Sequence, residues 1–444
     1  MDSRRVSLYP FLGGPGRSAP VIERTEGVHW QMAGGHRVLD AGGGAIIANV
    51  GHGREEIAEV AAAAMARTTY VVPPFATEDR VALVERLRRD WLPEGLTRCM
   101  FTSGGSEAVD SALRLVRQHF VSAGQPERVK VIGRHRAYHG ATLATLGVGG
   151  HEKRRKGLAP LFVDHPKIPA WYPLRRPASF DDEVGPQHSA EGLVEALERE
   201  GPETVAAFIA EPVAGSTLGA VVPPDDYWPR LRQICDDYGI LLIADEVMCG
   251  FGRTGRRFAL DHWDVVPDVL VGGKGLAGGY APIGAVFASE RVVAPITEAG
   301  DEVMFFTYSA HPMACAVAEK VLEILDREKL IERAASLGEQ LGKRLAQLET
   351  HPHVAHTRGL GLMRAVELVE DREALEPFPK EAGFISKVVA AGLGRGVFFY
   401  PGGCDPARDV ACFGPPFIIT EDHIEEMVAT LELSIDDAAE RVAG

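Results

Sequence analysis

The stretch Ile240-Leu241-Leu242-Ile243-Ala244-Asp245-Glu246-Val247 decides the predicted fold, because it is typical of a buried strand that ends in acidic residues. A predicted helix, Pro229 to Tyr238, leads into this stretch. It has proline at its start and Gly239 just past its end, as helices commonly do. A helix followed at once by a continuous apolar run indicates a βαβ unit in a mainly parallel sheet.

The same alternation of helical stretches and short apolar runs begins at about residue 56. The other strands that we expect are Arg98–Phe101, Val129–Ile132, Val205–Ala210, Val269–Val271 and Ala285–Ala288. Between the first two, the segment Ser106–Phe120 has apolar residues at helical spacing, so we expect a helix whose apolar side packs on the sheet. The pattern predicts an α/β fold, with the mainly parallel sheet in a large domain over residues 56–311.

The pattern changes after residue 311. We expect a smaller α+β domain over residues 312–444, built from helices at Met313–Asp326 and Leu330–Glu349, an alternating stretch at Leu360–Val369 and a helix near Lys380–Leu393. Residues 1–55 form an N-terminal segment, and its part 21–50 is predicted to be a β-meander that packs on the small domain. The proline-rich and charged segment Trp171–Ser189 is predicted to be a surface loop.

The composition excludes several classes of function. Acidic residues number 62 and Lys plus Arg 47, which gives a net charge of −15, so we expect no nucleic-acid partner. The six cysteines are scattered without a C-x-x-C pair, which is typical of a protein of the reducing cytoplasm. Apolar runs fall short of the roughly 20 residues that span a bilayer, and prolines and glycines interrupt the N-terminal residues 6–16. We therefore expect a cytoplasmic protein without a membrane partner.

Lys274 lies in Val271-Gly272-Gly273-Lys274-Gly275, at the end of a predicted buried strand. Ligands bind at the carboxyl ends of strands in α/β sheets, and glycines there allow the backbone close to a ligand. A lysine kept from water has a lowered pKa and becomes an amine nucleophile suited to a Schiff base. A lone lysine in a glycine-rich loop is more often a solvated surface residue, so this interpretation depends on the residues around Lys274.

Asp245 is the strongest of these neighbours. A carboxylate at the base of a pocket keeps the pyridine nitrogen of pyridoxal 5′-phosphate (PLP) protonated, as that cofactor's chemistry requires. An apolar strand ending in Asp-Glu also describes the magnesium-binding strand of a nucleotide triphosphatase. That alternative requires G-x-x-x-x-G-K-[ST] upstream, which the sequence lacks.

An anion site is predicted in Thr102-Ser103-Gly104-Gly105-Ser106-Glu107, which follows a strand and opens a helix. Free backbone N–H groups, the helix macrodipole and the Ser106 hydroxyl together suit a phosphate, with Gly104 and Gly105 permitting close approach. Taken alone, such a turn is more often a plain helix cap. Its place on the same edge of the sheet as Asp245 and Lys274 favours the phosphate.

Tyr138 and His139 follow the predicted strand Val129–Ile132, and the ring of Tyr138 suits stacking on a cofactor. The spacing of His135 and His139 resembles a metal pair, but Arg136 stands where the H-E-x-x-H motif needs its base, so we expect no metal. The basic run from His151 to Lys156 is more often a solvated face than a site.

With these residues in place, the sequence resembles the class III aminotransferases, the ω-aminotransferase branch of the fold-type I PLP enzymes. The resemblance covers nearly the whole chain and depends on many short motifs in order. They are Gly51-His52-Gly53, Ser103–Ala108, Tyr138-His139-Gly140, Glu211-Pro212-Val213, Asp245-Glu246-Val247, Lys274-Gly275-Leu276, Pro282-Ile283-Gly284-Ala285, Phe306-Thr307-Tyr308-Ser309 and Gly414-Pro415-Pro416.

The resemblance implies a role for each matching residue. Lys274 would form the Schiff base with PLP, Asp245 would hold the pyridine nitrogen, and Tyr138 and Val247 would lie against the two ring faces. Gly105 and Ser106 would bind the phosphate. Thr307 would reach the phosphate of the neighbouring subunit, which implies a homodimer. Glu211 would lie beside the substrate and help to set its geometry.

Substrate recognition is less defined. The family often has an arginine before Pro-Pro for a substrate carboxylate; here Arg408 is the nearest candidate and Arg364 a second one, although Arg358 and Arg364 also suit a bracing role. The implied activity is transfer of an amino group from an amine or ω-amino acid to a keto acid, with pyruvate favoured. A racemase, an aminomutase or a decarboxylase of the same fold remains the alternative, and a protein of this fold acting as a binding module is a third.

Overall fold

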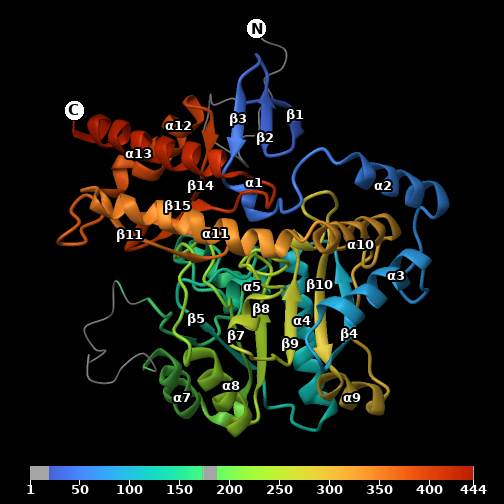
Figure 1. Ribbon diagram of the computed structural model, residues 1–444. Helices are drawn as coiled ribbons and strands as arrows, with labels where there is room; N and C mark the ends of the chain where they lie inside the picture. Colours follow the sequence, from blue (N-terminus) through green and yellow to red (C-terminus); the bar gives the residue numbers. More distant parts are fainter. Residues whose placement is uncertain (1–19, 173, 175–187, 444) are drawn as a thin grey trace.

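A seven-stranded sheet forms the centre of the computed structural model, which describes residues 20–172, 174 and 188–443. Its spatial order is β4-β10-β9-β8-β7-β5-β6 (Figure 1). Within the described residues β10 runs antiparallel to both its neighbours, and the other strands run parallel to one another. The strands are β4 (Leu96–Thr102), β5 (Lys130–Arg134), β6 (Lys167–Ile168), β7 (Val205–Ala210), β8 (Leu241–Asp245), β9 (Val269–Gly272) and β10 (Gly284–Ser289). All six strands expected from the sequence are confirmed, and the two-residue β6 is additional.

Helices cover both faces of this sheet because its strands are apolar on both sides. Leu241 and Ile243 of β8 face the layer of α4, whereas Leu242 and Ala244 face that of α8. The predicted helix at 106–120 is confirmed as α4. The predicted start of α8 at Pro229 is two residues late, while Gly239 ends the helix with φ +63°. The helices are α4 (Gly105–Ser122), α5 (Leu143–Val148) and α9 (Glu290–Ala299) on one face, and α7 (His188–Glu200) and α8 (Tyr227–Tyr238) on the other.

The C-terminal part of the chain combines helices with an antiparallel sheet of order β11-β12-β15-β14. The predicted helix Lys380–Leu393 is wrong at its start, because Gly383 adopts a left-handed φ of +54° and the α-helix begins after it. The helix predicted at Leu330–Glu349 is α-helical as far as Ala346 and continues as a 3₁₀ turn. The elements are α10 (Pro312–Arg327), α11 (Leu330–Ala346), β11 (Val354–Leu360), β12 (Met363–Leu368), α12 (Phe384–Gly394), β14 (Tyr400–Cys404), β15 (Ala407–Phe413) and α13 (Glu421–Ala443).

The N-terminal strands form a meander, as predicted for this region. They are β1 (Ile22–Glu26), β2 (His29–Met32) and β3 (Arg37–Asp40). The short strand β13 (Val397–Phe398) pairs in parallel with β3, so the two ends of the chain share one sheet. The helices α1 (Gly43–Ile46), α2 (Glu55–Arg67) and α3 (Glu78–Arg86) follow, and α2 and α3 pack on α10. Residues 1–19 and most of the predicted loop 171–189 lie outside the described residues.

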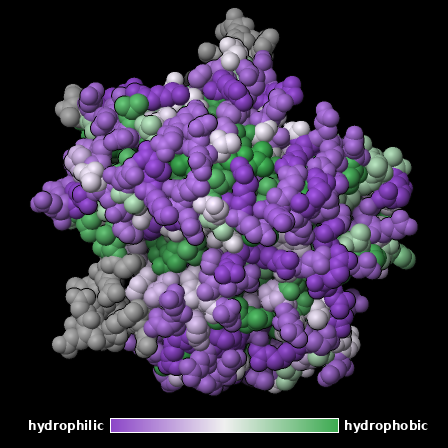
Figure 2. Space-filling model, viewed as in Figure 1, coloured by the Kyte–Doolittle hydropathy of each residue, from purple (hydrophilic) through white to green (hydrophobic). Residues whose placement is uncertain are grey.

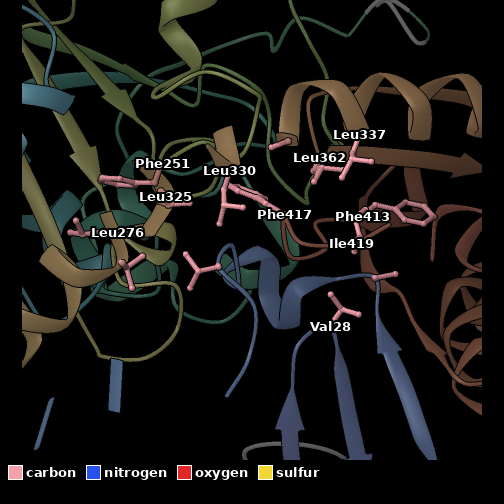
Figure 3. Close-up of a cluster of buried hydrophobic side chains, with 14 of the residues drawn as sticks. Val28, Phe251, Leu276, Leu325, Leu330, Leu337, Leu362, Phe413, Phe417 and Ile419 are labelled. Carbon is pink, nitrogen blue, oxygen red and sulfur yellow. The ribbon is translucent and has the colours of Figure 1, made fainter. Parts of the chain in front are cut away.

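One apolar cluster joins the loops of the large sheet to the C-terminal part of the chain (Figure 3). Phe251 and Leu276 come from the segments that follow β8 and β9, and Val28 comes from the N-terminal meander. The C-terminal part supplies Leu325, Leu330, Leu337, Leu362, Phe413, Phe417 and Ile419. The cluster therefore fixes the segments that carry Asp245 and Lys274 against the C-terminal part.

The surface shown in Figure 2 is mainly hydrophilic, and its hydrophobic residues form separate small groups. Within residues 20–172, 174 and 188–443, no helix is both long enough and apolar enough to cross a membrane.

Candidate active site

Five segments with predicted site residues meet at one edge of the large sheet. Lys274 follows β9, Asp245 ends β8, Glu211 follows β7, Tyr138 lies beyond β5 and Gly105 follows β4. All five strands run in the same direction, so their carboxyl ends share one edge. This edge, the rim of the sheet, is where α/β proteins bind ligands.

Lys274 begins a short 3₁₀ turn and has a φ of +41°, a left-handed conformation that residues other than glycine rarely adopt. Such backbone strain clusters at functional sites. Burial lowers the pKa of the Lys274 amine from 10.5 to about 8, although the nearby Asp245 and Glu211 act in the opposite direction. A substantial share of the amine is therefore neutral and nucleophilic near physiological pH.

Asp245 lies one strand away from Lys274 and is 4% exposed. Its Oδ2 lies 2.8 Å from Nδ1 of His139, and its Oδ1 accepts a hydrogen bond from the N–H of Val247 at 3.1 Å. The Nε2 atom of His139 is buried and has no hydrogen-bond partner within the described part of the chain. The histidine therefore fixes the orientation of the Asp245 carboxylate, which can then hold a proton on a ring nitrogen bound at the rim.

The start of α4 offers an anion-binding site. Within the described ranges, no acceptor faces the backbone N–H of Gly105 or Ser106. A Cβ atom on Gly105 would lie 2.8 Å from Cγ1 of Val247, so this position accepts only glycine while Val247 keeps its place. The Ser106 hydroxyl accepts a hydrogen bond from the N–H of Ala141 at 3.1 Å, which ties the helix start to the segment after Tyr138. Free N–H groups on an 18-residue helix suit a phosphate.

Glu211 holds the Tyr138 segment in place. Its Oε1 accepts a hydrogen bond from the N–H of Tyr138 at 3.0 Å, and its Oε2 accepts one from Gly215. Arg134 donates a hydrogen bond to the backbone carbonyl of Glu211 at 2.6 Å. Burial raises the pKa of the Glu211 carboxyl, and the nearby His139 and Arg134 oppose that effect. Arg134 was not predicted as a site residue; its position just after a predicted strand, on the same rim, was the available signal.

Thr307 lies away from these contacts, in an exposed turn after Phe306. Its backbone carbonyl accepts a hydrogen bond from the Tyr70 hydroxyl at 3.0 Å. The structure does not bring the Thr307 side chain into the group formed by Lys274 and Asp245.

The predicted substrate arginines have other contacts. Arg364 lies on the face of β12 opposite to Ala365, and its guanidinium packs on Gly342 of α11 and donates to the Gly361 carbonyl at 3.0 Å. The structure does not bring Arg364 to the rim. Arg408, at the start of β15, lies 3.1 Å from the Asp405 carboxylate.

Arg358 has the bracing role that the sequence suggested for it. Its Nε donates to the Gly219 carbonyl at 2.7 Å, and its guanidinium lies 2.9 Å from the Glu367 carboxylate. Arg358 is therefore paired with Glu367, as Arg408 is with Asp405. Two of the three arginines considered from the sequence already have a carboxylate partner.

The side chains of this site do not form a metal centre. In the part of the chain that the structure describes, no three His, Cys, Asp or Glu side chains come together in a way that could hold a metal ion. His139 is instead bound to Asp245.

Comparison with known proteins identifies relatives of the whole chain. The family model for aminotransferase class-III matches residues 15–435. A putrescine–pyruvate aminotransferase of Pseudomonas aeruginosa is 37% identical over 96% of this chain and 92% of its own length. A thermostable (S)-enantioselective omega-transaminase from Thermomicrobium roseum has a TM-score of 0.89 at 38% identity, covering 96% of this chain and 94% of its own. The omega transaminase from Pseudomonas jessenii in complex with PMP has a TM-score of 0.92 at 30% identity, covering 99% and 97%.

Proposed function

Because this chain belongs to the class-III aminotransferase family, we propose that it moves an amino group from an amine or ω-amino acid to a keto acid through the amine of Lys274. The observation that carries the proposal is the placement of Lys274 and the His139-bound Asp245 at the ends of adjacent strands. An amine with a pKa of about 8 beside a fixed carboxylate is the pair that this chemistry needs.

The residues at the rim fit PLP, the cofactor on which this family depends. The free N–H groups of Gly105 and Ser106, with Gly104 beside them, suit its phosphate, and Asp245 suits its pyridine nitrogen. Tyr138 and Val247 would lie against the ring, His139 would hold Asp245, and Lys274 would attach the aldehyde carbon. The relative from Pseudomonas jessenii was solved with PMP, which supports this assignment.

When bound, PLP supplies an aldehyde that accepts the amino group and a ring that withdraws electrons from the reacting carbon. Lys274, displaced by the substrate amine, acts as the general base and takes the proton from the substrate carbon. The Lys274 amine then delivers that proton to the former aldehyde carbon of the cofactor. Asp245 keeps the proton on the ring nitrogen throughout, and Glu211 holds the Tyr138 segment against the ring.

The acceptor that we favour is pyruvate. The supporting observation is the Pseudomonas aeruginosa relative, whose name states putrescine and pyruvate as its substrates. The donors that we propose are amines and ω-amino acids.

We also propose that the protein acts as a homodimer. The exposed turn of Thr307 carries exposed Met304, Phe305 and Tyr308, an apolar group suited to an interface between subunits. In that dimer Thr307 would complete the phosphate site of the neighbouring subunit. We further propose a cytoplasmic location, which the six free cysteines support. We also propose that the chain divides at residues 55 and 311 into an N-terminal segment, a large domain and a small domain.

The half-reaction tests this function. Holoenzyme mixed with a panel of amines and ω-amino acids, with no keto acid present, should convert the absorbance of the aldehyde form of the cofactor to that of its amine form, and release one carbonyl product per site. Pyruvate should then restore the starting spectrum and yield alanine, with 2-oxoglutarate as the comparison acceptor. Continuous turnover of a donor without any keto acid would contradict the proposal, since a racemase or decarboxylase needs no acceptor.

A further inference from the structure

The short helix α6 (Glu152–Arg155) carries the basic run that the sequence analysis interpreted as a solvated face. Arg154 is exposed, as that interpretation expects, and it also makes a specific contact with an aromatic ring. Its guanidinium carbon lies 4.5 Å from the centre of the Tyr138 ring, in the range of a cation–π contact. Arg155, the next residue, turns instead to Asp164 and to the ring of Phe162. Arg154 is thus directed at the rim, over the residue proposed to stack on the cofactor.

Arg154 also reaches the C-terminal sheet. Burial raises the pKa of the Tyr400 hydroxyl, and Arg154 opposes this as a neighbouring charge and hydrogen-bond donor. Tyr138 is a further electrostatic neighbour of the same hydroxyl. Tyr400 begins β14, which pairs with β15. Arg154 therefore lies close to both Tyr138 beyond β5 and Tyr400 of the C-terminal sheet.

The charge of Arg154 is not matched by a carboxylate. Within residues 20–172, 174 and 188–443, no carboxylate oxygen lies within 4.0 Å of its guanidinium, and the side chain is exposed. Arg408 differs, because Asp405 lies 3.1 Å away, and Arg364 packs on α11. A guanidinium offers two parallel N–H donors to a carboxylate, and an aromatic face on one side leaves that edge free.

We propose that Arg154 binds the carboxylate of the keto acid acceptor, and of the amino acid formed from it, at the mouth of the Lys274 site. This inference rests on the proposed aminotransferase function and deepens it by assigning substrate recognition to α6. The carboxylate takes the place of the Tyr400 hydroxyl as the partner of the guanidinium. An amine donor without a carboxylate makes no such contact, so one site accepts both substrate classes in turn.

The half-reactions of the holoenzyme separate this role from a structural one. Arg154→Ala should raise the concentration of alanine needed for half-maximal conversion of the cofactor by about 10- to 100-fold, the effect of losing a charge-assisted pair. The half-reaction with a carboxylate-free amine from the donor panel should change far less, and Arg154→Lys should restore part of the alanine affinity. Lys153→Ala, on the same helix, is the matched control and should behave as wild type.

A binding measurement keeps the inference testable even if no donor reacts. Calorimetric titration of the holoenzyme with propanoate, a carboxylate that has no amino or keto group, should give a dissociation constant that Arg154→Ala raises by about tenfold or more. Equal losses for alanine and the simple amine would show that Arg154 only supports Tyr138, and would overturn the inference. A carboxylate-selective loss in Arg408→Ala, with none in Arg154→Ala, would overturn it as well. Absence of conversion by every donor would overturn the proposed function, while unchanged propanoate binding would overturn the role of Arg154.

Discussion

At the scale of the residue, Lys274 owes its reactivity to its surroundings. Its left-handed backbone places the side chain at the rim, and burial lowers the pKa of its amine to about 8. Asp245 is fixed by His139 and by the N–H of Val247. Each property alone occurs in ordinary proteins, and their combination on adjacent strands makes an amine that captures an aldehyde.

The lowered pKa of Lys274 predicts how capture of PLP by the apoprotein depends on pH. Only the neutral amine reacts, so the rate constant should rise about tenfold per pH unit below about 8 and level off above it. Stopped-flow absorbance of the bound cofactor between pH 6 and about 10 measures this profile. A rate that still rises at the upper end of this range would mean that burial does not lower the pKa from its ordinary value of 10.5.

At the scale of the element, the start of α4 and the segment after β8 are matched to each other. Gly105 leaves room for the side chain of Val247, and a Cβ there would lie 2.8 Å from Cγ1 of that residue. The same turn presents the free N–H groups that suit the phosphate. A change in one segment therefore acts on the ring site and the phosphate site together.

Gly105→Ala should consequently weaken cofactor binding. Overpacking against Val247 costs about 1–3 kcal/mol, and because the α4 turn and Val247 both form the cofactor site, the dissociation constant of PLP should rise by about tenfold or more. Fluorescence titration of the apoprotein with PLP measures the change. Gly394→Ala is the matched control, because a Cβ at that exposed position meets nothing within 4 Å. Equal affinities for the two variants would show that the α4 turn lies outside the cofactor site.

The sequence predicted elements well where the local pattern determines them. The continuous apolar runs of β7 and β8 and the glycine after α8 are local signals, and the structure confirms them. The strands β11, β14 and β15 were not predicted, since polar or glycine residues interrupt their apolar pattern and they are defined by pairing with other strands. The contact of Arg154 with Tyr138 was also not predicted. It joins two separate segments, and a short basic run is usually solvated.

At the scale of the whole molecule, Arg253 connects three parts of the chain. This buried side chain donates to the Ala48 carbonyl at 2.8 Å and to the Pro415 carbonyl at 2.7 Å, and its guanidinium lies 4.6 Å from the ring centre of Phe417. Burial lowers the pKa of Arg253 to about 9. The N-terminal segment and the C-terminal part are therefore tied to the loop that follows Asp245.

Arg253→Met should destabilise the protein because it leaves two buried carbonyls without a donor. Each unsatisfied group costs about 1–3 kcal/mol, so the free energy of unfolding should fall by about 2–6 kcal/mol. Urea denaturation of the holoenzyme measures the shift. Arg256→Met, at an exposed position of the same loop, is the control and should change the free energy by less than about 0.5 kcal/mol. Equal urea midpoints for the two variants would show that Arg253 does not stabilise the junction of these three parts.

Mixed dimers test whether Thr307 completes the neighbouring site. Lys274→Ala should be inactive. Thr307→Ala should bind PLP about tenfold more weakly than wild type, because it loses a charge-assisted hydrogen bond. A dimer with one subunit of each kind has one site with both Lys274 and the partner's Thr307. Co-expressed, differently tagged subunits should therefore be more active at limiting PLP than either parent variant. Activity no greater than the average of the two parents would place Thr307 outside the neighbouring site.

The attachment point of the cofactor is the most direct test of the account, because every proposed role depends on Lys274. The PLP-loaded protein is reduced with borohydride, digested and analysed by mass spectrometry. We predict that the added mass of the reduced cofactor lies on Lys274 alone, and that Lys274→Ala carries none although it still binds PLP. Attachment to a different lysine, or a loaded wild-type protein with no attached cofactor, would contradict the account.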